Sequence, residues 1–464
     1  MKSLLLSCLL AVSTFAQTPV VDWDKTKTEI LQHFQALVRI DTSSPPGNET
    51  QIVQYLKKVL ETEGIPVKIF AKDPARANIV ARLKGNGRKR PLLIMAHSDV
   101  VGVQRDKWPV DPFGAVLKDG YVWGRGTVDD KDKLAANLVV FLLLKRTGIQ
   151  LDRDVIFFVE SGEEADPSGI GINFMVDEHF DEIDAEYCLT EGGSARIENG
   201  AVKMVQITTT EKVPVRVRLI TKGTAGHGSV PRTDNALIRL SAAVAKAGTW
   251  ETPMRLNDTT RTYFEKLALV SSPEASERYT SLLDPQRSAM AQRWLAENEP
   301  GNYSMLRTSV VPTILKAGFR MNVIPSEAEA TLDIRALPDE DPAKLFEELK
   351  RVIGDSTVAV ERTGNSRPAS PPSRIDTEMY RILEQVAKRV YPGAAVLPGM
   401  LTGSTDMAQL RAKGIQSYGV GPAVTNEDAT NFGPHSDVER IPEASLYKLV
   451  EFMWGAVTGV AASR

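Results

Sequence analysis

The sequence feature that most constrains the fold is a set of short apolar segments of strand type, several of which run into a histidine or an acid. Such segments occupy residues 78–83, 92–96 and 155–159, and "YCLT" precedes Glu191. A helical segment, "DKLAANLVVFLLLKRTG", lies between the second and the third. Strands that alternate with helices indicate an α/β domain with a mostly parallel sheet. In such sheets, functional groups gather outside the carboxyl ends of the strands.

Residues 212–365 predict a second, smaller domain inserted into the first. "VPVRVRLITKG" alternates apolar and basic residues, as in a strand with one face in water. A helix follows, then a charged helical excursion at 250–310, two strands around a Pro/Ser turn, and another helix. The order β-α-β-β-α-β, interrupted by the excursion, predicts a ferredoxin-like α+β domain. The main domain is therefore expected in two parts, 24–211 and 366–464.

The first residues have the features of a secretory signal peptide, assigned to residues 1–16. Lys2 precedes an apolar stretch, and small residues end at Ala16, after which cleavage is predicted. The stretch is too short for an ordinary membrane-spanning helix. Lipid attachment at Cys8 is an alternative, which the continuation of the apolar stretch past Cys8 disfavours. We expect the mature protein to be secreted or periplasmic.

Composition excludes several classes of partner. The chain has 464 residues, a formal net charge of -3 and a pI near 6.1, which give no indication of nucleic acid or an anionic membrane as partner. No later stretch is long and apolar enough for a membrane span. Removal of the signal peptide leaves Cys188 as the single thiol, so no internal disulfide can form. A catalytic thiol is one interpretation, but the apolar neighbours of Cys188 favour a small buried core residue.

Two polar motifs, taken singly, are open to structural interpretations. His97 and Asp99 are two residues apart at a strand end, so their side chains share one face. That spacing suits a metal-bound imidazole with a supporting carboxylate, although a histidine satisfied within the core is the alternative. Asp129 and Asp130 follow the tight "GRG" path into a helix, where acids can also simply stabilise the helix dipole.

Taken together, the polar strand ends predict a metal centre. His435 lies in a Gly/Pro loop, "NFGPHSDVERIP", near the C-terminus. Two imidazoles and several carboxylates at one edge of a sheet are what two divalent ions need, with one carboxylate between the ions. Zinc accepts this mixed set of nitrogen and oxygen ligands, and Mn²⁺ or Co²⁺ could also occupy it.

The motifs resemble those of a known enzyme family. The series "AHSDV", "GRGTVDDK", "SGEE", "TEGG", "GTAGHGSVP", "NVIPSEAEA", "GSTD" and "PHSD" is similar, in type and order, to the co-catalytic zinc exopeptidase and amidohydrolase family. That family includes aminoacylase-1, carboxypeptidase S, acetylornithine deacetylase, succinyl-diaminopimelate desuccinylase, carnosinase and the glutamate carboxypeptidases. The resemblance covers residues 25–455. "HGSVP" and the excursion are most similar to the aminoacylase-1/carboxypeptidase S branch.

The resemblance implies two zinc ions per chain. The implied ligands are His97, Asp129, Glu164, Glu191 and His435, with Asp129 bridging the ions. Asp99 supports His97, and Glu163 binds no metal but is the general base for the metal-bridging water. Adjacent residues on an extended segment point opposite ways, which suits different roles for Glu163 and Glu164. A carboxylate within hydrogen-bond reach can take the proton of the water and later give it to the leaving amine.

The resemblance also implies substrate-binding residues. His227 would stabilise the tetrahedral oxyanion, commonly from a second subunit, so a homodimer through the inserted domain is expected; a surface loop histidine is the alternative. Asn322 and Arg335 would bind the substrate carbonyl and carboxylate, and Arg335 favours substrates with a free C-terminus. Gly403 and Ser404 could add backbone donors, or could form a helix N-cap turn instead.

One residue departs from the family pattern. Asp132 stands where the family usually has glycine after "DDK". Such a residue changes the local turn or adds negative charge near the site, while all the implied ligands are retained.

The expected function is hydrolysis of amide bonds in small peptides, as in a carboxypeptidase or a dipeptidase. The enzymatic alternative is a deacylase of N-acyl amino acids. A catalytically silent peptide-binding relative is the non-enzymatic alternative, and it should have lost a ligand or the base. The chain has lost neither.

Overall fold

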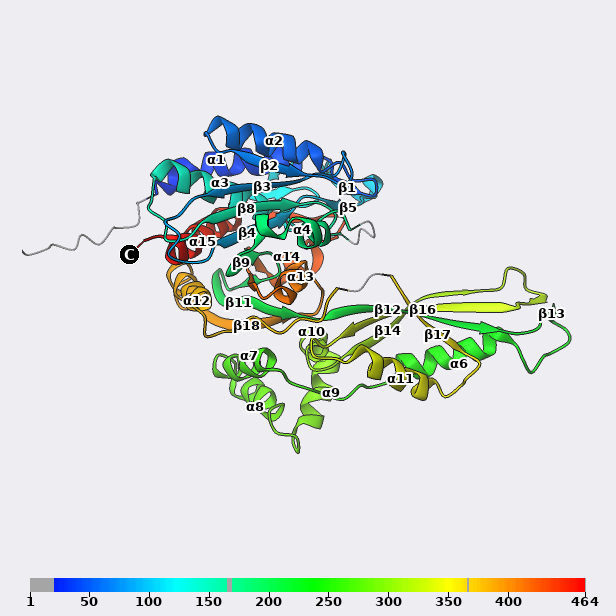
Figure 1. The fold of residues 1–464 in the computed structure, drawn as a ribbon. Coiled ribbons are helices and arrows are strands. Elements are labelled where there is room, and N and C mark those ends of the chain that lie inside the picture. The colour runs from blue at the N-terminus through cyan, green and yellow to red at the C-terminus, as the bar shows by residue number, and fades with distance from the viewer. Residues whose placement is uncertain (1–20, 165–168, 365–366, 464) are drawn as a thin grey trace, which may run out of the picture.

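The chain forms a thick α/β body from which a narrower arm projects (Figure 1). The computed structural model describes residues 21–164, 169–364 and 367–463. The predicted signal peptide at 1–16, with Cys8, lies outside the described residues. The predicted domain boundary between 365 and 366 does so as well.

A mixed sheet is the centre of the body. In the described part of the chain its ten strands follow the order β2-β3-β8-β4-β9-β19-β11-β10-β20, with β18 beside β11. Their bounds are β2 Val67–Phe70, β3 Asn78–Leu83, β4 Leu92–His97, β8 Val155–Glu160, β9 Tyr187–Thr190, β10 Ser194–Glu198, β11 Ala201–Glu211, β18 Ala395–Leu401, β19 Gln416–Gly419 and β20 Ala423–Thr425. The central neighbours β8, β4, β9 and β19 are parallel, and antiparallel pairs flank them on both sides. The predicted α/β class is confirmed.

Helices cover both faces of this sheet, which is why β4 and β8 are buried at every position. Alternate residues of β4 and β8 belong to two different hydrophobic cores. The helices on the larger core are α1 Trp23–Val38, α2 Thr50–Thr62, α3 Lys131–Thr147, α12 Glu378–Val390 and α15 Glu443–Ala461. The other face is covered by α4 Ile172–Glu178, α5 Phe180–Ile183 and α13 Met407–Ala412.

The arm is built on a second, antiparallel sheet of order β14-β16-β12-β17. Its strands are β12 Val213–Lys222, β14 Ser309–Ala317, β16 Glu327–Ala336 and β17 Ala359–Thr363. The helices α6 Ala236–Gly248 and α11 Pro342–Ile353 pack on one face and leave the other face without helices. This strand order is the ferredoxin-like arrangement that the sequence predicts. We call this arm the lid.

The two sheets are joined by a very short connection, because β11 runs into β12 through Lys212 alone. At the opposite end of the lid, β13 Gly226–His227 pairs with β15 Val323–Ile324. Figure 1 shows β13 at the far tip of the lid, away from β4 and β8. The limits 212 and 365 for the inserted domain stay a prediction.

The excursion, residues 250–310, is helical, as predicted, and it packs against the body at β18. Its helices are α7 Asp258–Leu269, α8 Pro273–Ser281, α9 Ser288–Asn298 and α10 Pro300–Ser304. They share a small core with Leu397 and Met400 of β18. The remaining elements are β1 Ser43–Ser44, β5 Val100–Val101, η1 Arg105–Lys107, β6 Val116–Lys118, β7 Tyr121–Trp123, α14 Asn426–Asn431 and β21 Arg440–Pro442. Within the described ranges, no helix combines the length and apolar character needed to cross a membrane.

Candidate active site

The polar strand ends meet at one edge of the central sheet. His97 is the last residue of β4, and it lies opposite Glu160, the last residue of β8. Glu191 directly follows β9, which is parallel to β4. Since the carboxyl ends of parallel strands share an edge, these side chains converge there.

Asp129 lies between the two histidines. Its Oδ1 is 3.0 Å from Nε2 of His97, and its Oδ2 is 3.2 Å from Nε2 of His435. Glu164 Oε1 is 3.0 Å from the same nitrogen of His435, and Glu191 Oε2 is 3.9 Å from Nε2 of His97. The structure thus brings together all five residues proposed as ligands, with one acid and one imidazole on either side of Asp129.

The backbone holds His97 in the tautomer that a metal ligand needs. Nδ1 of His97 lies 3.0 Å from the carbonyl oxygen of Asp99, which can only accept, so Nδ1 carries the proton. Nε2 is therefore the nitrogen that faces Asp129. A backbone carbonyl behind the imidazole is a usual way to orient a histidine that binds a metal.

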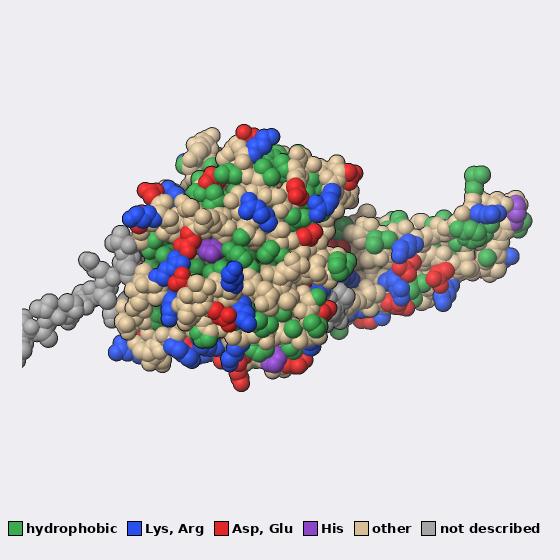
Figure 2. Space-filling view, turned by 90° about the horizontal axis from the view of Figure 1, so that it is seen from above, with side chains coloured by type: hydrophobic (Ala, Val, Ile, Leu, Met, Phe, Trp, Pro, Cys, Tyr) green, Lys and Arg blue, Asp and Glu red, His purple; other side chains and the backbone are tan. Residues whose placement is uncertain are grey.

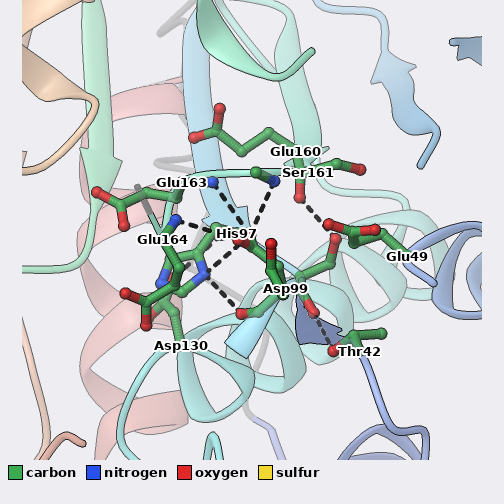
Figure 3. Close-up of polar contacts among 12 residues, drawn as sticks. Thr42, Glu49, His97, Asp99, Asp130, Glu160, Ser161, Glu163 and Glu164 are labelled. Carbon is green, nitrogen blue, oxygen red and sulfur yellow. Dashed lines mark hydrogen bonds and ion pairs between the residues drawn. The ribbon is translucent and has the colours of Figure 1, made fainter. Parts of the chain in front are cut away.

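The carboxylate of Asp99 organises the turn that carries the two glutamates. It accepts hydrogen bonds from the backbone N–H groups of Gly162, Glu163 and Glu164, at 2.9, 3.1 and 3.1 Å (Figure 3). Figure 3 shows the side chains of Glu163 and Glu164 leaving this turn in different directions. Glu164 reaches His435, whereas Glu163 reaches Arg367, so the neighbours have different partners.

A sixth candidate ligand, Asp130, was not among the ligands predicted from the sequence. A carboxylate oxygen of Asp130 lies close to ligand atoms of His97 and Glu191, all within 4.8 Å of one another. Asp130 is the N-cap residue of α3, but its side chain makes no capping hydrogen bond. The helix-cap interpretation therefore does not explain this buried acid.

A buried ion pair ties the segment of Asp129 to the segment of His435. Arg125 donates from Nη1 to Oε2 of Glu439 at 2.6 Å, and both side chains are buried. Oε1 of Glu439 also accepts from the backbone N–H of Val128, at 2.9 Å. The two loops that supply Asp129 and His435 are thereby held in a fixed relation.

The electrostatics of the cluster favour cations at its centre. Burial raises the pKa of Glu191 and of Asp130 well above the ordinary carboxyl range. Burial acts to lower the pKa of His97, but Asp129 and Asp99 outweigh it, and the pKa of His97 ends well above its usual value. Hydrogen bonds that His435 donates to Asp129 and Glu164 raise the pKa of His435 to about 10. The crowded acids therefore retain protons, whose positive charge offsets the repulsion between the carboxylates. Divalent ions bound at the same place would supply that positive charge instead.

The donor set fits the implied metals. Imidazole nitrogens and carboxylate oxygens are the ligands that zinc shares with manganese and cobalt. In each of two groups, His97-Asp130-Glu191 and His97-Asp129-Glu164, the potential ligand atoms lie within 4.8 Å of one another.

Glu163 is a largely buried acid that pairs with an arginine, and sequence reasoning missed this arginine. Arg367 Nη2 donates to Oε1 of Glu163 at 2.5 Å, and Nη1 lies 2.9 Å from Oδ1 of Asp406. Burial raises the pKa of Glu163 to about 7, with Arg367 acting in the opposite direction. A carboxyl group with a pKa near neutrality is suited to accept and release a proton. Arg367 lies in the Pro/Ser loop "SRPASPPS", which carries no periodic signal.

A cavity of about 400 Å³ opens beside the cluster. Glu163, Glu164 and His435 line it from the body, and Arg335 lines it from the lid. Gly403 and Ser404 also line it, and the N-cap of the following helix, α13, is Asp406 rather than either of them. The cavity therefore contains the predicted base, two candidate ligands and a predicted carboxylate binder.

Two predicted substrate-binding residues lie elsewhere in this chain. His227 is exposed on β13 at the tip of the lid, where its Nδ1 is 2.7 Å from Oγ of Ser229. Asn322 is close by, since its carbonyl accepts from the N–H of Gly228 at 2.8 Å. Neither His227 nor Asn322 lines the cavity.

Two other residues from the sequence analysis are buried. Cys188 is a residue of β9 and belongs to the core on one face of the sheet. Burial raises the pKa of its thiol, and the core interpretation is confirmed. Asp132 is buried in the first turn of α3, and its Oδ1 has no hydrogen-bond partner among the described residues. Burial raises the pKa of Asp132 to about 6.

Comparison with known proteins identifies the family. The profile of peptidase family M20/M25/M40 matches residues 93–458, which include all the candidate ligands. The chain belongs to this family. It is accordingly a metal-dependent hydrolase of amide bonds, and the resemblance predicted from the motifs is confirmed.

The relatives of this M20 chain differ in their named activities. A probable carboxypeptidase S-like 2 of Dictyostelium discoideum is 29% identical over 68% of this chain and 62% of that protein. The N-fatty-acyl-amino acid synthase/hydrolase PM20D1 of Xenopus tropicalis is 26% identical over 92% of this chain and 85% of that protein. The M20 family metallo-carboxypeptidase Sso-CP2 from Sulfolobus solfataricus has the same fold, with a TM-score of 0.72 and 20% identity over 92% of this chain and 98% of that one.

Proposed function

We propose that the chain removes the C-terminal residue from small peptides, with two metal ions, zinc in the first instance, at the His97–Asp129–His435 cluster. The observation that carries the proposal is Asp129, whose two oxygens face the two histidines at 3.0 and 3.2 Å. When bound, the ions would polarise the scissile carbonyl and lower the pKa of water.

The residues of the chain supply the proton transfer and the binding. Glu163 takes a proton from the attacking water and returns it to the leaving amine. Arg367 and Asp406 orient Glu163 for both transfers. Arg335 binds the free carboxylate of the substrate, and a guanidinium suits that group because its N–H donors match the two carboxylate oxygens.

Deacylation of N-acyl amino acids is the second candidate function. The similarity to PM20D1, named as an N-fatty-acyl-amino acid synthase/hydrolase, favours it. Both substrate types have a carboxylate beside the scissile amide, so they would use Arg335 in the same way. They differ on the acyl side, and a panel of dipeptides and N-acyl amino acids separates them.

The test of the hydrolytic mechanism is Glu163→Gln. The variant should bind as much metal as the wild type, measured by elemental analysis, and its turnover should fall by about 100- to 10,000-fold. Turnover like that of the wild type would contradict the proposed role. Metal content near zero after reconstitution with Zn²⁺, Mn²⁺ or Co²⁺, or tight peptide binding without cleavage, would favour a catalytically silent relative.

We also propose that the active form is a homodimer, with the lid of one copy reaching the cavity of the other. Neither His227 nor Asn322 lines the cavity of its own copy, which supports this arrangement. Figure 1 shows β13, the strand that carries His227, at the far tip of the lid. The lid also exposes hydrophobic side chains that a second copy would cover, and Figure 2 shows such patches along it. The exposed hydrophobic residues of the lid include Val230, Ile238, Ile314, Leu315, Phe319 and Met321.

Export of the chain is a separate proposal that rests on residues 1–16. Lys2 and the apolar stretch after it are its basis. N-terminal sequencing of the exported protein should begin at Gln17. A mature protein that still begins at Met1 would contradict it.

A further inference from the structure

The lid side of the cavity carries two arginines on neighbouring strands. Arg335 lies on β16 and Arg216 on β12, and both line the cavity. In the antiparallel register, Pro214 is opposite Arg335 and Arg216 is opposite Asp333. Arg216 and Arg335 are therefore diagonal neighbours on one face of the sheet, a relation that puts two residues about 7–8 Å apart. That face is the one that α6 and α11 leave free.

The terminal N–H groups of these arginines have no partner among the described residues. Arg335 donates its Nε–H to Oδ2 of Asp333 at 3.2 Å, which leaves its two Nη groups available. The guanidinium of Arg216 forms no hydrogen bond and no ion pair with the described part of the chain. The third arginine that lines the cavity, Arg367, already forms ion pairs with Glu163 and Asp406.

Two guanidinium groups with available terminal N–H groups exceed what one carboxylate requires. A single carboxylate is satisfied by one guanidinium through two parallel hydrogen bonds. If Arg335 binds the α-carboxylate, as in the proposed function on which this step rests, Arg216 remains beside it with its full charge. A cationic side chain in a cleft binds a ligand that carries an anionic group more tightly than a ligand of the same shape with an uncharged group.

The other residues that line the cavity also favour a polar ligand. Among the lining residues that the structure describes, Ile172 and Pro214 alone have hydrophobic side chains. The other described side chains that line it are carboxylates, guanidinium groups, amides, the imidazole of His435 and the hydroxyl of Ser404, and glycines provide backbone. Such a wall suits a polar ligand of limited size better than a long apolar chain.

We propose that Arg216 binds a second carboxylate, so that the preferred substrates end in aspartate or glutamate. The acidic side chain of that residue would lie next to its α-carboxylate, as Arg216 lies next to Arg335. Arg216 is thus a residue that determines specificity, while the metal cluster and Glu163 act on either kind of substrate.

The test compares glycyl-glutamate with glycyl-glutamine, which have nearly the same shape and differ by one charge. For the wild type we expect kcat/KM to be about 10- to 100-fold higher for glycyl-glutamate, the range typical of a hydrogen bond to a charged group. Arg216→Gln should abolish that preference by lowering kcat/KM for glycyl-glutamate to near the value for glycyl-glutamine. Arg216→Lys should retain part of the preference.

Arg218→Gln is the matched control. Arg218 is two residues further along the same strand and on the same face, but it pairs with Glu329 at 3.3 Å and Glu361 at 2.7 Å and does not line the cavity. It should keep the wild-type preference. Equal loss of preference in Arg218→Gln and Arg216→Gln would overturn a specific role for Arg216.

Calorimetric binding of free glutamate and free glutamine separates this inference from the proposed function. Equal cleavage of both dipeptides by the wild type overturns the inference and leaves the proposed function intact. If neither dipeptide is cleaved, the proposed function fails. In that case, tighter binding of glutamate that is lost in Arg216→Gln still supports the inference, and equal binding of the two amino acids overturns it.

Discussion

Arg367 donates a hydrogen bond of 2.5 Å to Oε1 of Glu163, although 204 residues separate the two in the chain. The same guanidinium faces Asp406, the N-cap residue of α13, at 2.9 Å. Arg367 belongs to the segment by which the chain returns from β17 of the lid to the body. The orientation of the proposed base therefore depends on a residue just outside the lid.

Replacement of Arg367 by alanine should reduce kcat by about 10- to 100-fold, because a base that is free to rotate is less often aligned for proton transfer. KM and metal content should change little, since Arg367 contacts no candidate ligand. Arg367→Lys should recover part of the loss. Steady-state kinetics with elemental analysis measures all three quantities.

Arg374→Ala is the control for this prediction. Arg374 lies in the same loop but is exposed and pairs with Asp376 at 2.7 Å. Its loss should leave kcat unchanged. An Arg367→Ala enzyme with the kcat of the wild type would show that Glu163 needs no such support.

The pH dependence of Arg367→Ala should differ from that of the wild type in a defined direction. Burial raises the pKa of Glu163 to about 7, and Arg367 acts to lower it. A base works in its unprotonated form, so activity falls as the pH drops through this pKa. Removal of Arg367 takes away a lowering influence, and the acid limb of kcat/KM should move to higher pH. A limb that stays in place or moves to lower pH would refute this reading.

Glu439→Gln should destabilise the fold, because it leaves the guanidinium of Arg125 buried without a counter-charge. Breaking a buried pair in this way costs about 3–5 kcal/mol in free energy of unfolding. The metal content should also fall, since Arg125 and Glu439 join the segments of Asp129 and His435. Urea unfolding of the metal-free protein measures the first effect, and elemental analysis measures the second.

An exposed pair provides the comparison for Glu439→Gln. Nζ of Lys448 and Oε2 of Glu451 lie 2.6 Å apart on α15, and both side chains are partly exposed. Glu451→Gln should therefore lower the free energy of unfolding by at most about 1 kcal/mol. If both variants lost a similar free energy of unfolding, burial would not account for the contribution of the Arg125–Glu439 pair to stability.

Two inactive variants should restore activity to each other when mixed. If the lid of one copy completes the cavity of the other, Glu163→Gln and His227→Ala damage different parts of one composite site. A mixed dimer then contains one site with both residues intact. Activity that appears on mixing and refolding, with neither variant active alone, supports the dimer. No recovery, together with a monomeric mass by light scattering, would contradict it.

The sequence was sufficient to locate most of the cluster, for a simple physical reason. His97 ends a buried strand, and Glu164 and Glu191 come after the ends of two others. Neighbouring parallel strands bring such residues to one edge without further information. The order of strands and helices in the lid could also be predicted from the sequence, because each element has the hydrophobic periodicity of its own type.

The parts that the sequence did not reveal depend on long-range contacts. Arg367 is in a loop without periodicity, and nothing local links it to Glu163. Asp130 adjoins Asp129 at a helix start, where either acid could serve the helix dipole. At the start of α2, the N-cap residue Glu49 makes no capping hydrogen bond, because its carboxylate pairs with the buried Arg76, which is 27 residues away in the chain.

The separation between the two sheets has a consequence for how such a chain can diversify. Every candidate metal ligand and the base lie outside residues 213–363, whereas Arg216 and Arg335 lie within them. Substitutions on the open face of the lid sheet can therefore change which substrates are accepted without disturbing the hydrolytic machinery. An inserted domain of this kind allows selectivity and bond cleavage to evolve as separate traits within one polypeptide.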